Sequence, residues 1–519
     1  MQYIFLRLNL FSNLCLVFLF GLVTNRVHAQ QINQVNPELI PINNVQELSD
    51  VHPTDWAYSA LQNLIQLYGY PQGYEDHSFR GNLALSRYEF ASALNSFFEK
   101  IVEPGELTFV QDDLITLRRL QRDFASELEA VKSQVTQLDK RIGVVETNQF
   151  STTTKLNGQV IFVTTAAFGE EKAITPGNMD NNTERLEDNL TLSGRVRLFF
   201  NTSFTGQDLL RVRLLAGNIQ NLQSATGTNM ARLSFDSNTN NQFKIDQLLY
   251  QFPLRENVRL TVILVGTIFS VVNPINPLLG NDSQGSPFLF GVRSPIYREE
   301  IGGTGVGISY DISDQFNLSA IYLATDAESP TSGSGLFNGA FSALSQLTWQ
   351  PSSSGKIALA YSRSFNAIDI NAGGLNTNAP FGEESDSISA DSYGLITTWQ
   401  LSSKVSIGGW AGWVRAQAQD IVDKPTAEIL YYAATLAVSD LAQEGDLAGL
   451  VLGQPPRLID NEFSGIDDPD PAFNLELFYR LPARKNISVT PGLLVIFNPE
   501  HNNSNDTIYV GTIRTTFSF

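Results

Sequence analysis

The chain has 519 residues and carries 53 acidic against 34 basic side chains, which gives a formal net charge of −19 at pH 7. A chain this acidic is not suited to nucleic acid, whose phosphates attract basic surfaces, so no nucleic-acid partner is expected. The only cysteine, Cys15, lies close to the N-terminus, which excludes disulfides, thiol catalysis and cysteine-ligated metal from the rest of the chain.

Residues 1–29 have the pattern of an export signal. Arg7 supplies a positive start, residues 14–23 form an apolar core, and Ala29 ends a small-residue cleavage site. We therefore expect a mature chain that begins at Gln30. The apolar core is too short to cross about 30 Å of hydrocarbon, and no later apolar run reaches the roughly 18 residues of a transmembrane helix. A closed β-barrel, however, can also span a membrane.

Residues 45–105 have the pattern of a compact unit with two helices. Trp56 begins an apolar helical face, and residues 69–74 follow it as a Gly- and Pro-containing turn. Ser86 can cap the second helix, and Glu89, three residues later, can complete a capping box. The spacing therefore predicts a small helical domain.

This unit resembles one S-layer-homology repeat. The matching features are the Asp-Val start at Asp50, Trp56 on the first helix, the Gly-Tyr turn, and the Ser-Arg-Tyr-Glu step that contains Arg87. The resemblance implies binding to peptidoglycan or peptidoglycan-linked polysaccharide, with Asp50, Trp56 and Arg87 at the contact. A guanidinium group grips acidic groups in a fork, which suits Arg87 to this role. The alternative is a packing module in which Arg87 only pairs with Glu89.

Residues 107–147 are predicted to form a coiled coil. Apolar residues repeat there with a period of 3.5, and eleven of the twelve a and d positions are apolar. The a positions are Leu107, Leu114, Gln121, Leu128, Val135 and Ile142, and the d positions are Val110, Leu117, Phe124, Val131, Leu138 and Val145. The narrow stripe favours helices wound around partner helices over a helix packed on its own chain. A homotrimer is expected by analogy with bacterial porins, because the a and d residues are too mixed to choose.

Residues 150–519 have a period of two. Around Arg195 and Arg197, for example, charged residues alternate with Val196 and Leu198. Many such segments, an export signal and no apolar helix predict a mainly β fold, a transmembrane antiparallel β-barrel in contact with outer-membrane lipid. At roughly 20–25 residues per strand with its share of loop, the region holds about 16 strands. The alternative is a soluble β-sandwich.

Aromatic residues beside short turns favour the barrel. Tyr and Trp prefer the membrane–water boundary, and short turns are typical of the periplasmic rim. Five expected strands carry such a residue close to their end, namely Tyr250, Tyr310, Trp349, Trp399 and Tyr479. The last strand ends on Phe519, which resembles the assembly signal of outer-membrane proteins. A sandwich needs neither feature.

Residues 471–519 and 445–456 resemble the cyanobacterial branch of the carbohydrate-selective (OprB-like) porin family. With the S-layer-homology repeat and the coiled coil in front, this resemblance extends over nearly the whole mature chain. It implies an outer-membrane porin that passes small organic solutes and inorganic ions, including iron, with its N-terminal domain in the periplasm.

Four arginines at alternating positions are candidates for the pore lining. Lipid penalises an arginine at mid-membrane by about 2–4 kcal/mol, so Arg195, Arg197, Arg211 and Arg213 are expected to face the lumen. An equally good interpretation is that they pair with carboxylates on neighbouring strands. Acidic residues gather in expected loops, at Glu383, Glu384, Asp386, Asp460, Glu462, Asp467, Asp468 and Asp470. If those loops form the narrowest point, the pore prefers cations; if the arginines form it, anions.

Two long inserts could narrow the pore. One covers residues 273–303, and the other covers residues 417–472 with a helix-forming centre from Thr426 to Leu441. Either could fold into the lumen or form an extracellular cap.

Catalytic, cofactor and metal sites are not expected. Only His52, His77 and His501 follow the export signal, without the spacing of a zinc or iron site. A lone barrel histidine is too little for a barrel phospholipase. The aspartates of residues 467–470 could hold calcium, although a solvated acidic loop is the commoner meaning. The remaining rival to a porin is a structural tether, in which the barrel is only a membrane anchor.

Overall fold

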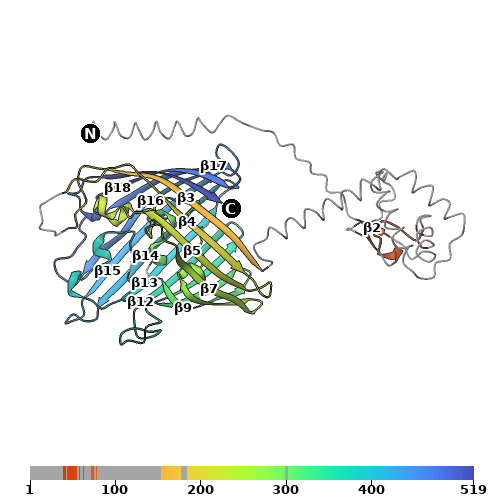
Figure 1. Ribbon diagram of the computed structural model, residues 1–519, viewed down its shortest axis with the longest axis horizontal. Helices are drawn as coiled ribbons and strands as arrows, with labels where there is room; N and C mark the ends of the chain where they lie inside the picture. The colour runs from red at the N-terminus through yellow and green to blue at the C-terminus, as the bar shows by residue number, and fades with distance from the viewer. Residues whose placement is uncertain are drawn as a thin grey trace. The chain divides into compact units, whose positions relative to one another are not determined.

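The computed structural model describes residues 39–41, 44–54, 58, 62, 72–74, 77–78, 153–176, 184–276, 278–298, 302–368 and 370–519. The chain divides into two compact units, residues 26–149 and residues 1–25 with 150–519. The second unit contains a closed antiparallel barrel (Figure 1). Its sixteen long strands are β3 (Thr154–Phe168), β4 (Thr191–Thr202), β5 (Leu209–Ile219), β7 (Lys244–Arg255), β8 (Val258–Gly266), β9 (Gly303–Ser313), β10 (Phe316–Ala324), β11 (Phe341–Ser352), β12 (Gly355–Phe365), β13 (Ile388–Gln400), β14 (Val405–Ala418), β15 (Thr426–Ser439), β16 (Leu447–Asn461), β17 (Phe473–Arg484), β18 (Ile487–Phe497) and β19 (Ile508–Ser518).

The barrel closes where its last strand pairs with its first. β19 runs antiparallel to β3, with Phe517 opposite Val160. Phe519 completes this seam, because its amide donates to the Gly158 carbonyl at 3.0 Å and its carbonyl accepts from the Gly158 amide at 2.7 Å. The predicted number of sixteen strands is confirmed. The short strand β6 (Ser237–Asn238) is an addition that pairs only with the end of β5.

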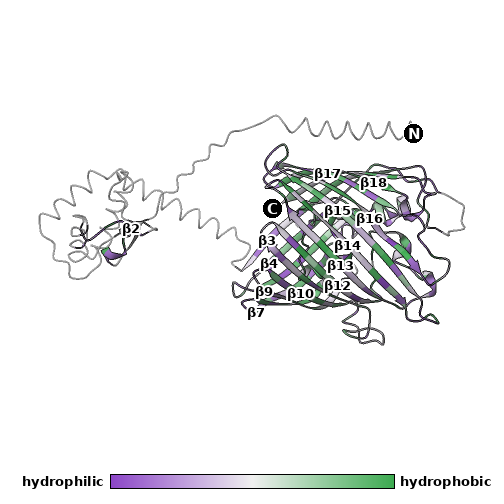
Figure 2. Ribbon diagram, turned by 180° about the vertical axis from the view of Figure 1, so that it is seen from behind, coloured by the Kyte–Doolittle hydropathy of each residue, from purple (hydrophilic) through white to green (hydrophobic). Residues whose placement is uncertain are grey.

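Alternation along the strands separates two faces of the barrel wall. On β13, Tyr393 and Leu395 are about half exposed, whereas Ile396 is buried. Figure 2 shows the result as hydrophobic and hydrophilic colours that alternate along the strands. Because a lipid bilayer covers the outer face of such a barrel, the exposed apolar residues form the surface that lipid contacts.

The two ends of the barrel differ in the length of their connections. Residues 256–257, 314–315, 353–354 and 485–486 make tight turns at one end, and the segments of the opposite end include residues 220–243, 267–302 and 366–387. Tyr250 and Tyr479 approach the short-turn end and donate hydrogen bonds to turn aspartates: Tyr250 to Asp208 at 2.9 Å, and Tyr479 to Asp446. These tyrosines therefore have an apolar ring on the wall and a polar tip at the rim.

The helix expected at residues 426–441 is wrong, because this segment is the strand β15. Its Ala and Leu content suits a helix, but alternate residues are buried along its length. Ala427, Ala433 and Ala437 are small enough to leave space on the inner wall for the apolar loop described below. The tertiary context has overridden the local helix propensity.

The described part of residues 26–149 is small. β1 (Leu39–Pro41) and β2 (Gln72–Tyr74) form an antiparallel pair, the 3-10 helix η1 (Val45–Glu47) follows β1, and Tyr58 and Gln62 are helical. Asp50 is exposed in a turn. The export signal, Trp56, Arg87, most of the S-layer-homology repeat and the coiled coil lie outside the described residues.

No helix in the described ranges has both the length and the apolar character of a membrane span.

Candidate pore constriction

Residues 267–302 join β8 to β9 and fold into the barrel. The segment contains η3 (Ile268–Ser270), α7 (Leu289–Val292) and η4 (Pro295–Arg298). This resolves the question left open for the first insert, because the contacts of the segment are with inward-facing residues of strands around the wall. We call residues 267–302 the inner loop. The second insert is instead the pair β15 and β16 with the connection after them.

Polar anchors hold the inner loop to strands on several sides. The buried Glu476 carboxylate on β17 accepts from the Ser286 hydroxyl at 2.6 Å and from the Gly291 amide at 2.8 Å. Tyr297 donates to Gln346 of β11 at 2.6 Å. A buried carboxylate without such donors would cost several kcal/mol, so Glu476 fixes the position of α7.

Apolar contacts seat the same loop against the wall. Phe290 lies edge-on to Trp410 of β14, with 5.8 Å between the ring centroids. Gly394 of β13 makes room for Ile296, because a Cβ at residue 394 would come within 2.9 Å of the Ile296 side chain. The interior of this half of the barrel is therefore a hydrophobic core that includes loop and wall.

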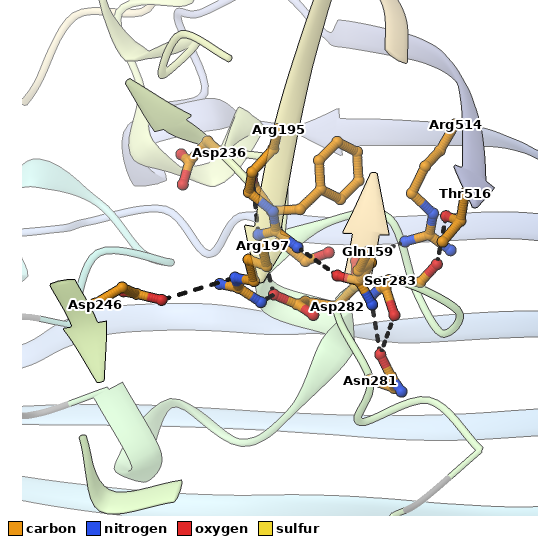
Figure 3. Close-up of polar contacts among 12 residues, drawn as sticks. Gln159, Arg195, Arg197, Asp236, Asp246, Asn281, Asp282, Ser283, Arg514 and Thr516 are labelled. Atoms are coloured by element: carbon orange, nitrogen blue, oxygen red, sulfur yellow. Dashed lines mark hydrogen bonds and ion pairs between the residues drawn. The ribbon is translucent and has the colours of Figure 1, made fainter. Parts of the chain in front are cut away.

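Asp282 is the polar centre of the opposite side of the loop. Its carboxylate lies 3.1 Å from Arg195 Nη1 and 2.7 Å from Arg197 Nη1, and its carbonyl accepts from Arg514 Nη1 at 2.9 Å (Figure 3). Arg514 is fully buried and also donates to the Gly285 carbonyl at 2.7 Å. Asp282 thus joins the loop to β4 and, through Arg514, to β19.

The structure places the four candidate arginines on the inner face of β4 and β5, and three of them meet carboxylates. Besides the contacts of Arg195 and Arg197 with Asp282, Arg213 Nε lies 2.5 Å from Asp246 of β7. Arg211 donates to Asn201 at 2.7 Å. These contacts match the interpretation in which the arginines pair with carboxylates, one of them on a neighbouring strand. Arg197 and Arg213 remain partly accessible.

A cavity of about 610 Å³ lies between the inner loop and the short-turn end. Amide, hydroxyl and charged groups line much of it, among them Asn273, Asn281, Asn317, Gln350 and Lys356. A wall with many donors and acceptors can replace water around a polar solute. This space forms a polar chamber beside the loop.

The acidic residues of the long-connection end do not form a metal site. Asp468 is buried and accepts from the Leu458 amide at 2.8 Å and the Asn376 amide group at 2.9 Å, whereas Asp467 is exposed. Within the described ranges, no group of three His, Cys, Asp or Glu side chains is placed to hold a metal ion. His501 is buried with its Nδ1 accepting from the Ala472 amide at 2.9 Å, which makes it a structural residue.

Sequence patterns did not identify Asp282, Glu476 or Arg514. Arg514 lies on the inner face of β19 with Thr512 and Thr516, so the alternation that identified the β4 and β5 arginines applies to it as well. Asp282 has no such signal, because the inner loop lacks a period. Its partners appear only when the barrel brings residues 195, 282 and 514 together.

A closed sixteen-stranded barrel with an exposed apolar outer face and a long connection folded inside is the architecture of an outer-membrane porin. The family model for carbohydrate-selective porins of the OprB family matches residues 111–519, and this chain belongs to that family. Porins are channels, and the protein is not an enzyme.

Two cyanobacterial relatives extend over nearly the whole chain. An uncharacterized protein of Synechocystis is 37% identical over 92% of this chain and 91% of its own length. An uncharacterized protein of Nostoc is 33% identical over 92% of this chain and 85% of its own length. The high-pH structure of Pseudomonas putida OprB is similar with a TM-score of 0.51, at 13% identity over 73% of this chain and 97% of that chain. At that identity the likeness concerns the fold alone.

Proposed function

We propose that this porin passes small organic solutes and inorganic ions, iron among them, by diffusion, and that residues 45–105 tether it to peptidoglycan from the periplasmic side. The observation that carries the channel is a closed barrel crossed by a charged inner loop, with partly accessible arginines and a polar chamber beside it. Iron and other ions enter the proposal through the resemblance to the cyanobacterial branch. A homotrimer is proposed from the heptad repeat of residues 107–145.

A structural tether with little channel activity is the second candidate. The apolar packing of Phe290 and Ile296 against the wall favours it, because a filled interior leaves less space for solutes. The purified protein in a planar bilayer distinguishes the two. Stepwise conductance is expected for the porin, and a silent bilayer with intact oligomers would support the tether.

The wall tether is tested with Arg87→Ala. Loss of a charge-assisted contact to an acidic polysaccharide group is expected to weaken pull-down on purified cell wall by roughly tenfold or more. Arg80→Ala, in the same predicted domain but outside the Ser-Arg-Tyr-Glu step, is the matched control and should pull down normally. Oligomerisation and conductance should persist in both variants. Unchanged pull-down of Arg87→Ala would leave this arginine only a packing role.

A further inference from the structure

Arginines outnumber carboxylates around the inner loop. Asp282 alone interacts electrostatically with six of them, namely Arg195, Arg197, Arg213, Arg293, Arg298 and Arg514. Three further carboxylates lie close by. Asp246 and Asp236 already have an arginine each, Arg213 and Arg232, and Glu476 accepts hydrogen bonds from Ser286 and Gly291 of the loop. Charges inside a narrow, low-dielectric passage are screened less than charges in bulk water. Among the residues that the structure describes, the inner loop and the facing wall therefore carry a net positive charge.

The contacts of Asp282 show which kind of group these arginines hold. Its Oδ2 atom accepts from Arg195 and Arg197 together, at 3.1 and 2.7 Å. Paired guanidinium groups around one oxygen are the arrangement that binds carboxylates, phosphates and sulfates. The Asp282 carboxylate of the inner loop thus occupies an oxyanion site formed by Arg195 and Arg197. An arginine without a carboxylate partner can still bind an oxyanion.

Arg298 is such an arginine. It lies at the end of η4 and is half-buried, with Arg293 and Arg232 as like charges and Asp236 and Asp282 as opposite charges in its surroundings. No hydrogen bond or ion pair joins the Arg298 side chain to a side chain or backbone group of the described ranges, and its Nε is buried without an acceptor there. A half-buried guanidinium whose Nε has no acceptor among the described residues, and which lies near two other guanidinium groups, is a favourable place for an anion from outside the chain.

We propose that the positive charge around the inner loop makes the pore anion-selective, and that Arg298 binds a small inorganic oxyanion there. This inference rests on the proposed channel function and narrows it. Glu383, Glu384 and Asp386 at the long-connection end are exposed, so salt screens their effect within about 10 Å. A metal such as iron would then pass as a negatively charged chelate.

Reversal potentials of the full-length protein in a KCl gradient test the selectivity. The wild type is expected to prefer chloride over potassium. Arg298→Gln should lower the anion-to-cation permeability ratio by about threefold or more, because it removes one unit charge that lies a few ångströms from a passing ion. Sulfate added in the millimolar range should reduce the chloride current of the wild type and not that of Arg298→Gln. Neutralising Glu383, Glu384 and Asp386 together is the matched control, with little expected change.

A second variant separates the effect of the charge on ion selectivity from the binding of an oxyanion. Arg298→Lys keeps the charge and loses the fork, so it should remain anion-selective while sulfate inhibition weakens. Cation preference in the wild type would overturn the proposal although the channel function stands. Anion preference without sulfate inhibition would overturn the oxyanion site. A silent bilayer would refute the channel function itself.

Discussion

Asp282→Ala is expected to lower the free energy of unfolding of the barrel by roughly 3–5 kcal/mol, the usual cost of removing one partner from a buried ion pair. The change leaves Arg195, which is fully buried, beside Arg197 without the carboxylate that both share. The temperature at which the purified protein loses its compact migration in detergent gels measures the loss. The freed loop should also make single-channel currents noisier.

Two variants bracket this result. Asp282→Asn keeps an oxygen acceptor without the charge and should lie between the wild type and Asp282→Ala. Asp386→Ala removes an exposed aspartate of another connection and should change stability by about 0.5 kcal/mol or less. If Asp282→Ala were as stable as Asp386→Ala, the arginines of β4 would have another counter-charge.

Another buried carboxylate, Glu500, lies at the long-connection end of the barrel. Glu500 accepts from the Leu375 amide at 2.6 Å, next to His501 and Asp468, which surround Gly374. Glu500 and His501 have φ values of 58° and 54°, in the left-handed region that residues other than glycine seldom adopt. Four connections meet at this point, those that contain Thr228, Gly374, Asp468 and Glu500, and their mutual contacts hold the strained backbone.

Alkaline pH is expected to loosen this junction. Burial raises the pKa of Glu500 to about 8, against hydrogen bonds from Thr228 and Leu375 that lower it. Because the folded chain then binds the proton more tightly than the unfolded chain, stability falls as pH rises from the ordinary value of 4.5 toward about 8. Between pH 6.5 and 8 the loss amounts to about 2 kcal/mol. Burial also raises the pKa of Asp468, from 3.8 to about 6, so this residue adds a loss of stability as pH rises between these two values.

The window above pH 6.5 isolates Glu500 from its neighbour His501. Burial lowers the pKa of His501 to about 3, so its opposite contribution, a gain in stability with rising pH, is nearly all made by about pH 6.5. Amide hydrogen exchange at Leu375, corrected for intrinsic rates, should show less protection at pH 8 than at pH 6.5. Glu500→Gln should remove this difference, and the exposed Glu384→Gln should retain it. An unchanged pH profile in Glu500→Gln would show that another group titrates.

Much of the barrel could be predicted because the alternation of lipid-facing and lumen-facing residues can be read within each strand. Lipid outside and polar groups inside impose a period of two on every strand, and the count of sixteen follows from the length of the region. The period fails where the interior is itself apolar. On β15, both faces are largely hydrophobic, since Ile429 and Tyr431 face the inner loop and Tyr432 is exposed on the outside, so the alternation that marks β4 is lost.

The constriction could be predicted only in part, because it depends on contacts distant in sequence. The arginines of β4 and β5 were identified by the cost of placing them in lipid. Whether they line an open passage or meet carboxylates depended on Asp282, which is 85 residues from Arg197 along the chain. No pattern within either segment carries this information.

Asp282 also ties the stability of the interior to the order in which the barrel assembles. It contacts Arg195 on β4 and Arg514 on β19, the two strands on either side of β3, where the circle of strands is completed. Arg514 is 232 residues from Asp282 along the chain, and its contact with the inner loop requires β19 to be in place. A barrel in which β19 has not yet paired lacks the Arg514 donors to the Asp282 and Gly285 carbonyls, and its inner loop is less stable for that reason. The inner loop therefore obtains the stability of these contacts only in a molecule whose circle of strands is complete.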